Sequence, residues 1–207
     1  MDTVLGVAFN DFVILAADRS DAFGILRLTE DVSKITPLTS NIAMAMTGEP
    51  GDADQFARFV QCNFELEKFR DDGWEVSLQR AYNWITWELA MDIRSNSPYV
   101  VFPLVGGYDF SEKRGKLYWI DYLGTGAEVT YGGHGHGETF ATGFLDRYHK
   151  PDMPREVAID LVKRALDAIQ TRFIVGQNRF QMVIVDKDGI HDLPDHFIDR
   201  ARCSATK

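Results

Sequence analysis

Two charged residues near the start of the chain have the types and spacing that acid–base chemistry needs. Asp18 ends an apolar run, and Lys34 begins the next apolar segment sixteen residues later. A carboxylate and a lysine can tune a chain-end amine, and that amine can activate a nucleophile within hydrogen-bond reach. The chain begins Met1-Asp2, which carries neither a hydroxyl nor a thiol. The supporting groups of such a reaction are therefore present, and its nucleophile is missing.

Two short strands are expected to bring these residues together. The apolar runs 3–9 and 12–17 flank the pair Asn10-Asp11, a pattern typical of a β-hairpin. The second strand of this hairpin places Asp18 beside the start of the first strand. A chain end, a buried Asp and a Lys that meet on sheet edges form the layout of an N-terminal-nucleophile hydrolase.

Composition limits the class of protein. The 207 residues are 45% hydrophobic and 26% charged, as in an ordinary soluble globular chain. The net charge of −9 argues against a nucleic-acid or anionic-membrane partner. Two cysteines, Cys62 and Cys203, make no disulfide framework or paired zinc motif, which favours a reducing compartment. No apolar run reaches the roughly 18 residues that span a bilayer, and the start lacks a signal-peptide pattern. We expect one domain, residues 1–198, with a tail at 199–207, in a cytosolic or nuclear protein.

The remaining apolar patterns predict two sheets covered by helices. The candidate strands are 3–9, 12–18, 25–29, 34–36, 41–46, 99–105, 116–121, 127–131, 181–186 and 190–192, and the candidate helices are 52–70 (capped by Asp52), 76–95, 138–147 and 154–173. This order predicts a four-layer αββα sandwich in the α+β class. The first two helices each carry two apolar stripes, one of them with Trp84 and Trp87. Such helices pack against the sheet and also against either another subunit or their own neighbours.

Several strings of the sequence together resemble the β subunits of the 20S proteasome. The early strings are Thr3-Val-Leu-Gly-Val7, Val13-Ile-Leu-Ala-Ala-Asp18, Lys34, Met44-Ala-Met-Thr-Gly48 and Gly51-Asp-Ala-Asp54. The later strings are similar to the non-catalytic beta-4-type subunit of eukaryotes, called beta type-2 in the other nomenclature. They are Ser97-Pro-Tyr-Val100, Val105-Gly-Gly-Tyr-Asp109, Ile120-Asp-Tyr-Leu-Gly124, Leu145-Asp146, His149-Lys-Pro-Asp-Met153 and Val185-Asp-Lys-Asp-Gly-Ile190. The resemblance covers the chain from Met1 to about Ile190, and its fold is that of N-terminal-nucleophile hydrolases.

The resemblance implies positions for a catalytic site. Active members of the family use an N-terminal threonine as nucleophile and its α-amino group as base, with an Asp, a Lys and a glycine N–H in support. Asp18, Lys34 and Gly48 occupy the Asp, Lys and glycine positions, whereas the threonine position falls on Asp2.

Three further supporting positions of the family also lack the required residue type. The family's supporting serine corresponds to a place within 133–137, where only glycine and histidine occur, and its downstream Asp and Ser fall near Phe173 and Gly176. The resemblance therefore implies a chain with no catalytic residue, no metal and no cofactor.

The function that the resemblance implies is architectural. The chain would be a structural β subunit of a 28-chain hetero-oligomer that carries out ubiquitin-dependent, ATP-linked protein degradation in the cytoplasm and nucleus. Its partners would be other β subunits within the ring and across the ring interface, and α-ring subunits, with no nucleic acid and no membrane. Phe23 is expected to line a pocket between subunits.

Two alternative functions stay open at this point. The chain could be an active amidohydrolase that uses Thr3 after trimming, although a shift of one residue along a strand turns a side chain to the opposite face. It could also be a free-standing binding protein with the same sandwich.

Simpler explanations compete with the chemical ones. Asp18 and Lys34 suffice as a structural ion pair, because a buried lysine needs a partner, and Gly48 suffices as part of a turn before a helix. His134 and His136 could share a metal, but no third ligand has motif spacing. We therefore interpret their segment as a glycine-rich loop. Cys62 lies among apolar residues of a predicted helix, which indicates an inert packing cysteine.

Overall fold

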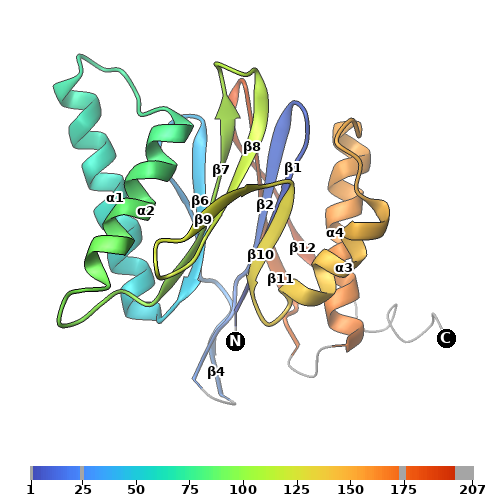
Figure 1. The fold of residues 1–207 in the computed structure, drawn as a ribbon. Helices are drawn as coiled ribbons and strands as arrows, with labels where there is room; N and C mark the ends of the chain where they lie inside the picture. The colour runs from blue at the N-terminus through green and yellow to red at the C-terminus, as the bar shows by residue number, and fades with distance from the viewer. Residues whose placement is uncertain (1, 24–25, 173–175, 199–207) are drawn as a thin grey trace.

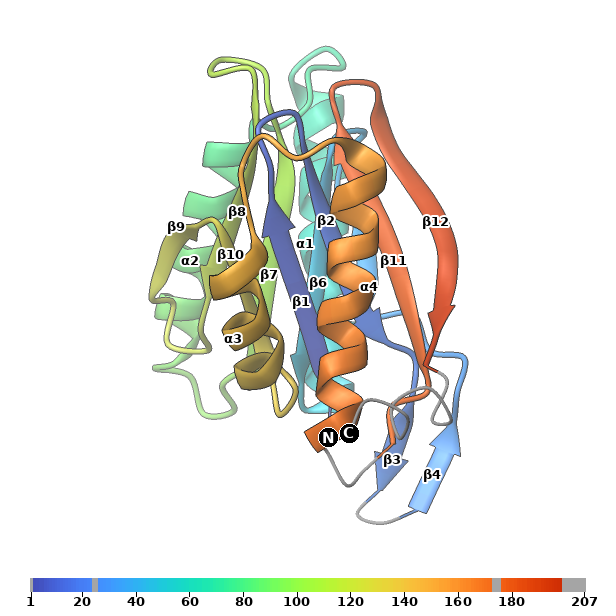
Figure 2. The ribbon, with the colours of Figure 1, turned by 90° about the vertical axis from the view of Figure 1, so that its right-hand side faces the viewer.

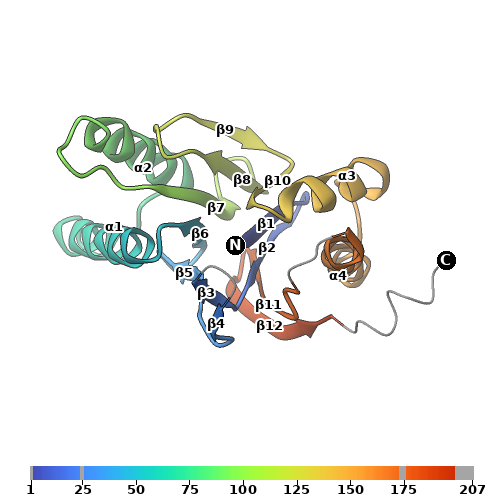
Figure 3. The ribbon, with the colours of Figure 1, turned by 90° about the horizontal axis from the view of Figure 1, so that it is seen from below.

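The computed structural model describes residues 2–23, 26–172 and 176–198. Within these residues, two five-stranded sheets pack face to face, and two helices cover the outer face of each sheet (Figure 1 and Figure 3). The predicted four-layer αββα sandwich of the α+β class is confirmed. The predicted tail, 199–207, lies outside the described residues.

The first sheet contains the predicted N-terminal hairpin. Its antiparallel strands, in spatial order, are β10 (Tyr131–Gly135), β1 (Thr3–Ala8), β2 (Phe12–Asp18), β11 (Arg179–Asp186) and β12 (Gly189–Phe197). Two helices, α3 (Glu138–Tyr148) and α4 (Arg155–Arg172), cover this sheet (Figure 2). Ala8 pairs with Val13 across the turn of the hairpin, so the end of β2 returns to the start of β1.

The second sheet is covered by the other two helices. Its strands, in spatial order, are β5 (Ile35–Pro37), β6 (Ile42–Gly48), β7 (Val101–Asp109), β8 (Arg114–Ile120) and β9 (Gly126–Val129). The covering helices are α1 (Pro50–Arg70) and α2 (Leu78–Asp92). A small hairpin, β3 (Asp21–Phe23) and β4 (Leu26–Thr29), extends beyond the sheets near the N-terminus (Figure 2). No helix in the described part of the chain is long and apolar enough to cross a bilayer.

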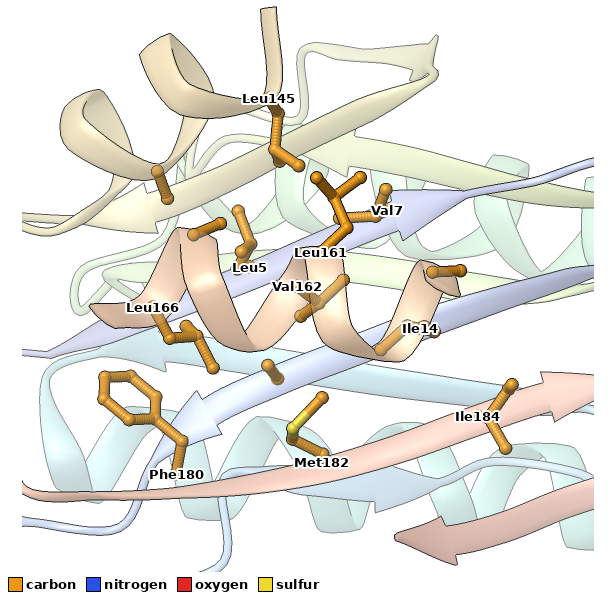
Figure 4. Packing of buried hydrophobic residues seen from close by; sticks show 14 of the residues in the cluster. Leu5, Val7, Ile14, Leu145, Leu161, Val162, Leu166, Phe180, Met182 and Ile184 are labelled. Carbon is orange, nitrogen blue, oxygen red and sulfur yellow. The ribbon is translucent and has the colours of Figure 1, made fainter. Parts of the chain in front are cut away.

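The strands of the hairpin are buried on both faces. Leu5 and Val7 of β1 belong to the apolar cluster under α4, which also contains Val162 (Figure 4). Val4 and Ala8 belong instead to the cluster between the two sheets. Because side chains alternate along a strand, a sheet covered on both sides needs apolar residues at nearly every position. This explains the continuous apolar runs from which the hairpin was predicted.

Helix α1 does not begin at Asp52 as predicted. It begins at Pro50, with Glu49 as the N-cap residue, because proline fits the first helical position, where its missing N–H costs no helix bond. The Asp52 carboxylate instead accepts a hydrogen bond from the backbone N–H of Val100 at 3.0 Å. Asp52 therefore ties the first turn of α1 to the approach of strand β7.

The segment interpreted as a glycine-rich loop is partly a strand, which corrects the prediction. Residues 131–135 form β10, an edge strand in which His134 pairs with Val4. Gly135 has a φ of +91°, and a Cβ there would lie 2.0 Å from the carbonyl oxygen of Asp2. Glycine is required at this position because the backbone of β1 approaches so closely.

The second apolar stripe of α1 is exposed to solvent. Cys62, Leu66 and Phe69 lie four and three residues apart along the helix, and Phe69 is 84% exposed. The predicted packing cysteine, Cys62, is also exposed, so that prediction was wrong. A helical stripe faces the core only where another element of the chain covers it, and here none does among the described residues.

The second apolar stripe of helix α2 is partly exposed to solvent and partly packed against helix α1. Trp87 is 58% exposed. Trp84 is half-buried, with ring contacts to Phe59 and Phe64 of α1 at 5.7 and 5.3 Å. Packing against a neighbouring element of the chain therefore holds for Trp84, and packing of Trp87 against another subunit stays a prediction.

Candidate functional site

The structure brings Asp2, Asp18 and Lys34 into one cluster. Asp2 precedes β1, Asp18 ends β2 and Lys34 precedes β5. The Lys34 Nζ lies 2.8 Å from Asp2 Oδ1, 3.0 Å from Asp18 Oδ1 and 2.8 Å from the carbonyl oxygen of Ser20. An ammonium group has three hydrogens to donate. The three acceptor oxygens therefore use all three hydrogens of the Lys34 ammonium.

Asp18 is the most enclosed member of the cluster. Its side chain is fully buried. Besides Lys34, it accepts hydrogen bonds from the backbone N–H of Thr3 at 2.8 Å and from the Ser20 hydroxyl at 2.6 Å. A carboxylate can be charged in such a place because its partners replace the lost water. The predicted ion pair between Asp18 and Lys34 is present.

Asp2 gives the cluster a second carboxylate. Its side chain is 22% exposed and contacts the same ammonium as Asp18. A lysine ammonium that donates to two carboxylates has no lone pair with which to accept a proton. At the position where the family resemblance implies a threonine, the chain therefore presents an anion instead of a hydroxyl.

A cavity of about 150 Å³ opens beside this cluster. Its apolar wall includes Met46, Ala53 and Ala57, and Asp2 and Lys34 lie on its polar side. The remaining lining residues are Asp21, Val32, Ser33, Thr36, Thr47, Gly48, Pro50 and Asp54. The hollow and the charged cluster together have the form of a small binding pocket.

Gly48 lies at the edge of this cavity, where β6 ends. It has a φ of +151°, and a Cβ there would lie 2.2 Å from the carbonyl oxygen of Val100. The next residue, Glu49, donates its backbone N–H to the same oxygen at 3.0 Å. Glycine is therefore required at position 48 because the end of β6 and the start of β7 approach so closely. This requirement is independent of any role of the Gly48 N–H in catalysis.

Thr3 points away from the cavity. It is fully buried, and its hydroxyl oxygen accepts a hydrogen bond from the backbone N–H of Gly137 at 3.1 Å. A Cβ on Gly137 would contact both this hydroxyl and Ile169 of α4, so the Thr3 side chain lies toward the helical layer. This placement agrees with the alternation of side chains along a strand.

The segment in which the resemblance implies a supporting serine contacts Asp2 and Thr3 through its backbone. His136 donates its N–H to the carbonyl oxygen of Asp2 at 3.2 Å, and Gly137 donates its N–H to the hydroxyl of Thr3 at 3.1 Å. Residues 133–137 carry no hydroxyl. Of the implied downstream positions, Phe173 lies outside the described residues and Gly176 is buried.

Some residues of the charged cluster and of the cavity were not identified from the sequence. Ser20 could have been found from the Asp-x-Ser string 18–20, because an Asp often accepts hydrogen bonds from the residue two positions on. Asp21 and Asp54 have no comparable local signal. Phe23 belongs to β3, where it pairs with Leu26, and its side chain is outside what the structure describes. Its place in a pocket between subunits remains a prediction.

His134 lies between the two sheets, away from the cavity. Its Nε2 is 3.2 Å from the carbonyl oxygen of Pro103, and its ring stacks on Trp119 with centroids 4.8 Å apart. Burial lowers the pKa of His134 to about 4. In the described ranges, no group of three or more His, Cys, Asp or Glu side chains is arranged to hold a metal ion.

We expect this histidine to make the fold sensitive to acid. Because its pKa falls from 6.5 to about 4 on folding, the unfolded chain binds more protons between these pH values. Stability is therefore lost as the pH falls. At about 1.4 kcal/mol per unit, the loss reaches about 3 kcal/mol below pH 4. Urea unfolding across this range should show a slope that His134→Phe reduces. If His191→Gln, at a half-exposed site, reduced it equally, the assignment to His134 would be wrong.

Comparison with known proteins places these features in context. A family model described as "Proteasome subunit" matches residues 1–185. The chain is 38% identical over 195 residues to proteasome subunit beta type-4 of Saccharomyces cerevisiae, covering 94% of this chain and 98% of that protein. It is 41% identical over 192 residues to proteasome subunit beta type-2-A of Arabidopsis thaliana, covering 93% of each. It is 34% identical over 197 residues to proteasome subunit beta type-2 of Trypanosoma brucei brucei, covering 91% and 96%.

Proposed function

This chain belongs to the proteasome subunit family, and from that premise we propose that it is a non-catalytic structural β subunit of the 20S core particle. As a member of the family, it assembles with other proteasome subunits. In the proposal it occupies one place in a β ring of a 28-chain particle, in the cytoplasm and nucleus. It contacts β neighbours in its ring and across the ring interface, and α-ring subunits. Peptide hydrolysis belongs to sibling chains.

The observation that carries the proposal is the ion pair between Asp2 and Lys34. Catalysis by an N-terminal nucleophile needs a hydroxyl or thiol beside its base. Here the position implied for that hydroxyl holds a carboxylate bonded to the lysine at 2.8 Å. The alternative nucleophile, Thr3, is not favoured because its hydroxyl is buried and bonded to Gly137 on the helical side.

Restoring a threonine at the second position should not restore catalysis. We expect an Asp2→Thr chain with Met1 removed to form no adduct with an electrophilic peptide probe that reacts with N-terminal threonines. The reason is that the contacts of residues 136 and 137 with Asp2 and Thr3 are backbone contacts, which provide no hydroxyl to support the reaction. Intact-mass spectrometry of the chain in its particle makes the measurement, with a sibling chain that does react as the internal control. An adduct on residue 2 would contradict the proposal that this chain is non-catalytic.

The exposed stripe of α1 gives a separate test of assembly. Cys62 lies in the stripe with Leu66 and Phe69, and its thiol is exposed in the free chain. If a neighbouring subunit covers this stripe, a thiol reagent should label Cys62 at least about tenfold more slowly in the particle, since buried thiols are inert. A Cys203→Ser background makes Cys62 the only cysteine. Equal labelling of the free and assembled chain would show that the stripe is not an interface.

A further inference from the structure

A short segment in the wall of the cavity beside Asp2 is tied to the first sheet by polar contacts. Residues 30–33 lead from the end of β4, which lies beyond the sheets in Figure 2, back toward β5. Val32 and Ser33 line the cavity, and helix α1 lines another part of it. We refer to residues 30–33 as the strap.

The strap takes no part in the apolar core. None of its four residues belongs to the three apolar clusters found in the described part of the chain. The Val32 N–H donates to the carbonyl oxygen of Arg19 at 3.0 Å, and the Ser33 hydroxyl donates to Gln181 Oε1 at 2.9 Å. A segment that has few buried apolar contacts opens locally at a much lower free energy than the whole fold.

Four charged side chains also join the strap to the first sheet. The guanidinium of Arg19 lies 2.7 Å from the Asp31 carboxylate and 3.3 Å from that of Asp195. The guanidinium of Arg179 lies 2.5 Å from Asp195 and 3.3 Å from Asp31. Each arginine therefore contacts both carboxylates, which closes a ring of ion pairs. Asp31 is the member of this ring that the strap contributes, since the others follow β2 or lie in β11 and β12.

The ring is weakest at Asp31. The Asp31 side chain is 71% exposed, whereas that of Asp195 is 15% exposed. Exposed ion pairs contribute little to stability and are screened by salt. If Asp31 moves away, Arg19 and Arg179 still contact Asp195. Release of the strap therefore leaves neither arginine without a carboxylate partner.

We propose that the strap is a salt-sensitive gate of the cavity beside Asp2, with Asp31 as its ionic latch. In the closed state, which the structure shows, Asp31 completes the ring and the strap forms part of the cavity wall. In the open state, Asp31 leaves the ring, the strap moves away from the first sheet, and small solutes reach the cavity. The strap would open in the same way in a catalytic chain, so the gate is independent of the proposed function.

Hydrogen exchange of the full chain at low salt tests the latch. We expect Asp31→Asn to speed exchange at the amides of residues 30–33 about three- to tenfold, the effect of losing two exposed ion pairs. Sodium chloride at about 1 M should speed exchange at these amides of the unsubstituted chain by a similar factor, because the Debye length falls to about 3 Å. The same salt should change exchange in Asp31→Asn by less than about twofold, because the latch is already lost.

An exposed ion pair elsewhere provides the matched control. Glu128 pairs with Arg114 at 2.8 Å, and neither residue lines the cavity beside Asp2. Glu128→Gln removes this pair and should leave exchange at residues 30–33 unchanged.

A thiol in the cavity wall reports whether movement of the strap opens the cavity. Thr47 lines the cavity and is 8% exposed. Thr47→Cys, in a background of Cys62→Ser and Cys203→Ser, introduces a thiol that is the only one in the chain. A thiol reagent at low salt should label it about three- to tenfold faster when Asp31→Asn is added, as the strap opens more often.

Three results would overturn the proposal. Asp31→Asn could leave exchange at residues 30–33 unchanged, or speed exchange equally along the whole chain, which would make Asp31 a support of the entire fold. Glu128→Gln could speed exchange of the strap as much as Asp31→Asn does. Labelling at position 47 could keep the same rate in Asp31→Asn, which would show that the strap does not gate the cavity.

Discussion

Lys34→Met will lower the free energy of unfolding by about 3–5 kcal/mol, the typical cost of removing one partner from a buried ion pair. The Lys34 side chain is 12% exposed and serves both Asp2 and the fully buried Asp18. Without the ammonium, two carboxylates face each other with no cation between them. Urea unfolding of the full-length chain at pH 7 measures the loss. Fluorescence of the tryptophans is a convenient probe of this transition.

A surface lysine provides the matched control for this variant. Lys68 pairs with Glu75 at 2.7 Å, but its side chain is 49% exposed. Lys68→Met should therefore cost less than about 1 kcal/mol, as is usual for exposed pairs. Adding Asp2→Asn and Asp18→Asn to Lys34→Met should recover part of the lost stability, because neutral amides tolerate burial better than unpaired charges. If Lys34→Met cost no more than Lys68→Met, the cluster would not be a structural element of the fold.

Gly48→Ala will destabilise the chain by about 2–4 kcal/mol, through backbone strain and a steric clash. An added Cβ would lie 2.2 Å from the Val100 carbonyl oxygen, on a residue with a φ of +151°. The nearest atoms, the Val100 carbonyl oxygen and the Val101 Cα, belong to the backbone and cannot rotate away as the end of a side chain can. The end of β6 must therefore move away from the start of β7. The same movement would distort the wall of the cavity beside Asp2. Thermal unfolding of the variant measures the loss.

The same substitution should have the opposite effect elsewhere in the chain. Gly143 lies in helix α3, and a Cβ there would meet no atom within 4 Å. Gly143→Ala should stabilise the chain by about 0.5–1 kcal/mol, because alanine loses less backbone freedom in a helix than glycine. A neutral Gly48→Ala alongside a stabilising Gly143→Ala would contradict the close approach of the two segments at Gly48.

Local patterns were sufficient for much of the fold. The apolar runs on either side of Asn10-Asp11 predicted the β1–β2 hairpin, because adjacent residues determine the turn type and the length of the strands. The helices were predicted within a few residues for the same reason. The error at residues 131–135 arose because a neighbour distant in sequence decided the outcome. Residues 131–135 form a strand only because β1 offers an edge to pair with, which a glycine-rich string does not indicate.

Burial was harder to predict than secondary structure. Cys62 was expected to be packed because it lies among apolar residues. The structure exposes it, since Phe56, Val60 and Phe64 occupy the face of α1 that meets the sheet. A helix with apolar residues on two faces does not reveal which of them its own chain covers.

For the candidate site, the sequence by itself determined the residue types and the side of the strand on which each lies. It was enough to predict that Asp18 would meet Lys34, that the second position lacks a hydroxyl, and that Thr3 would face away from Asp2. Only the tertiary structure decided that Asp2 itself bonds to Lys34 and that a cavity opens beside them. The physical reason is range: alternation and turn chemistry act between adjacent residues, whereas charge pairing and cavities depend on segments that meet only after the sheets have packed.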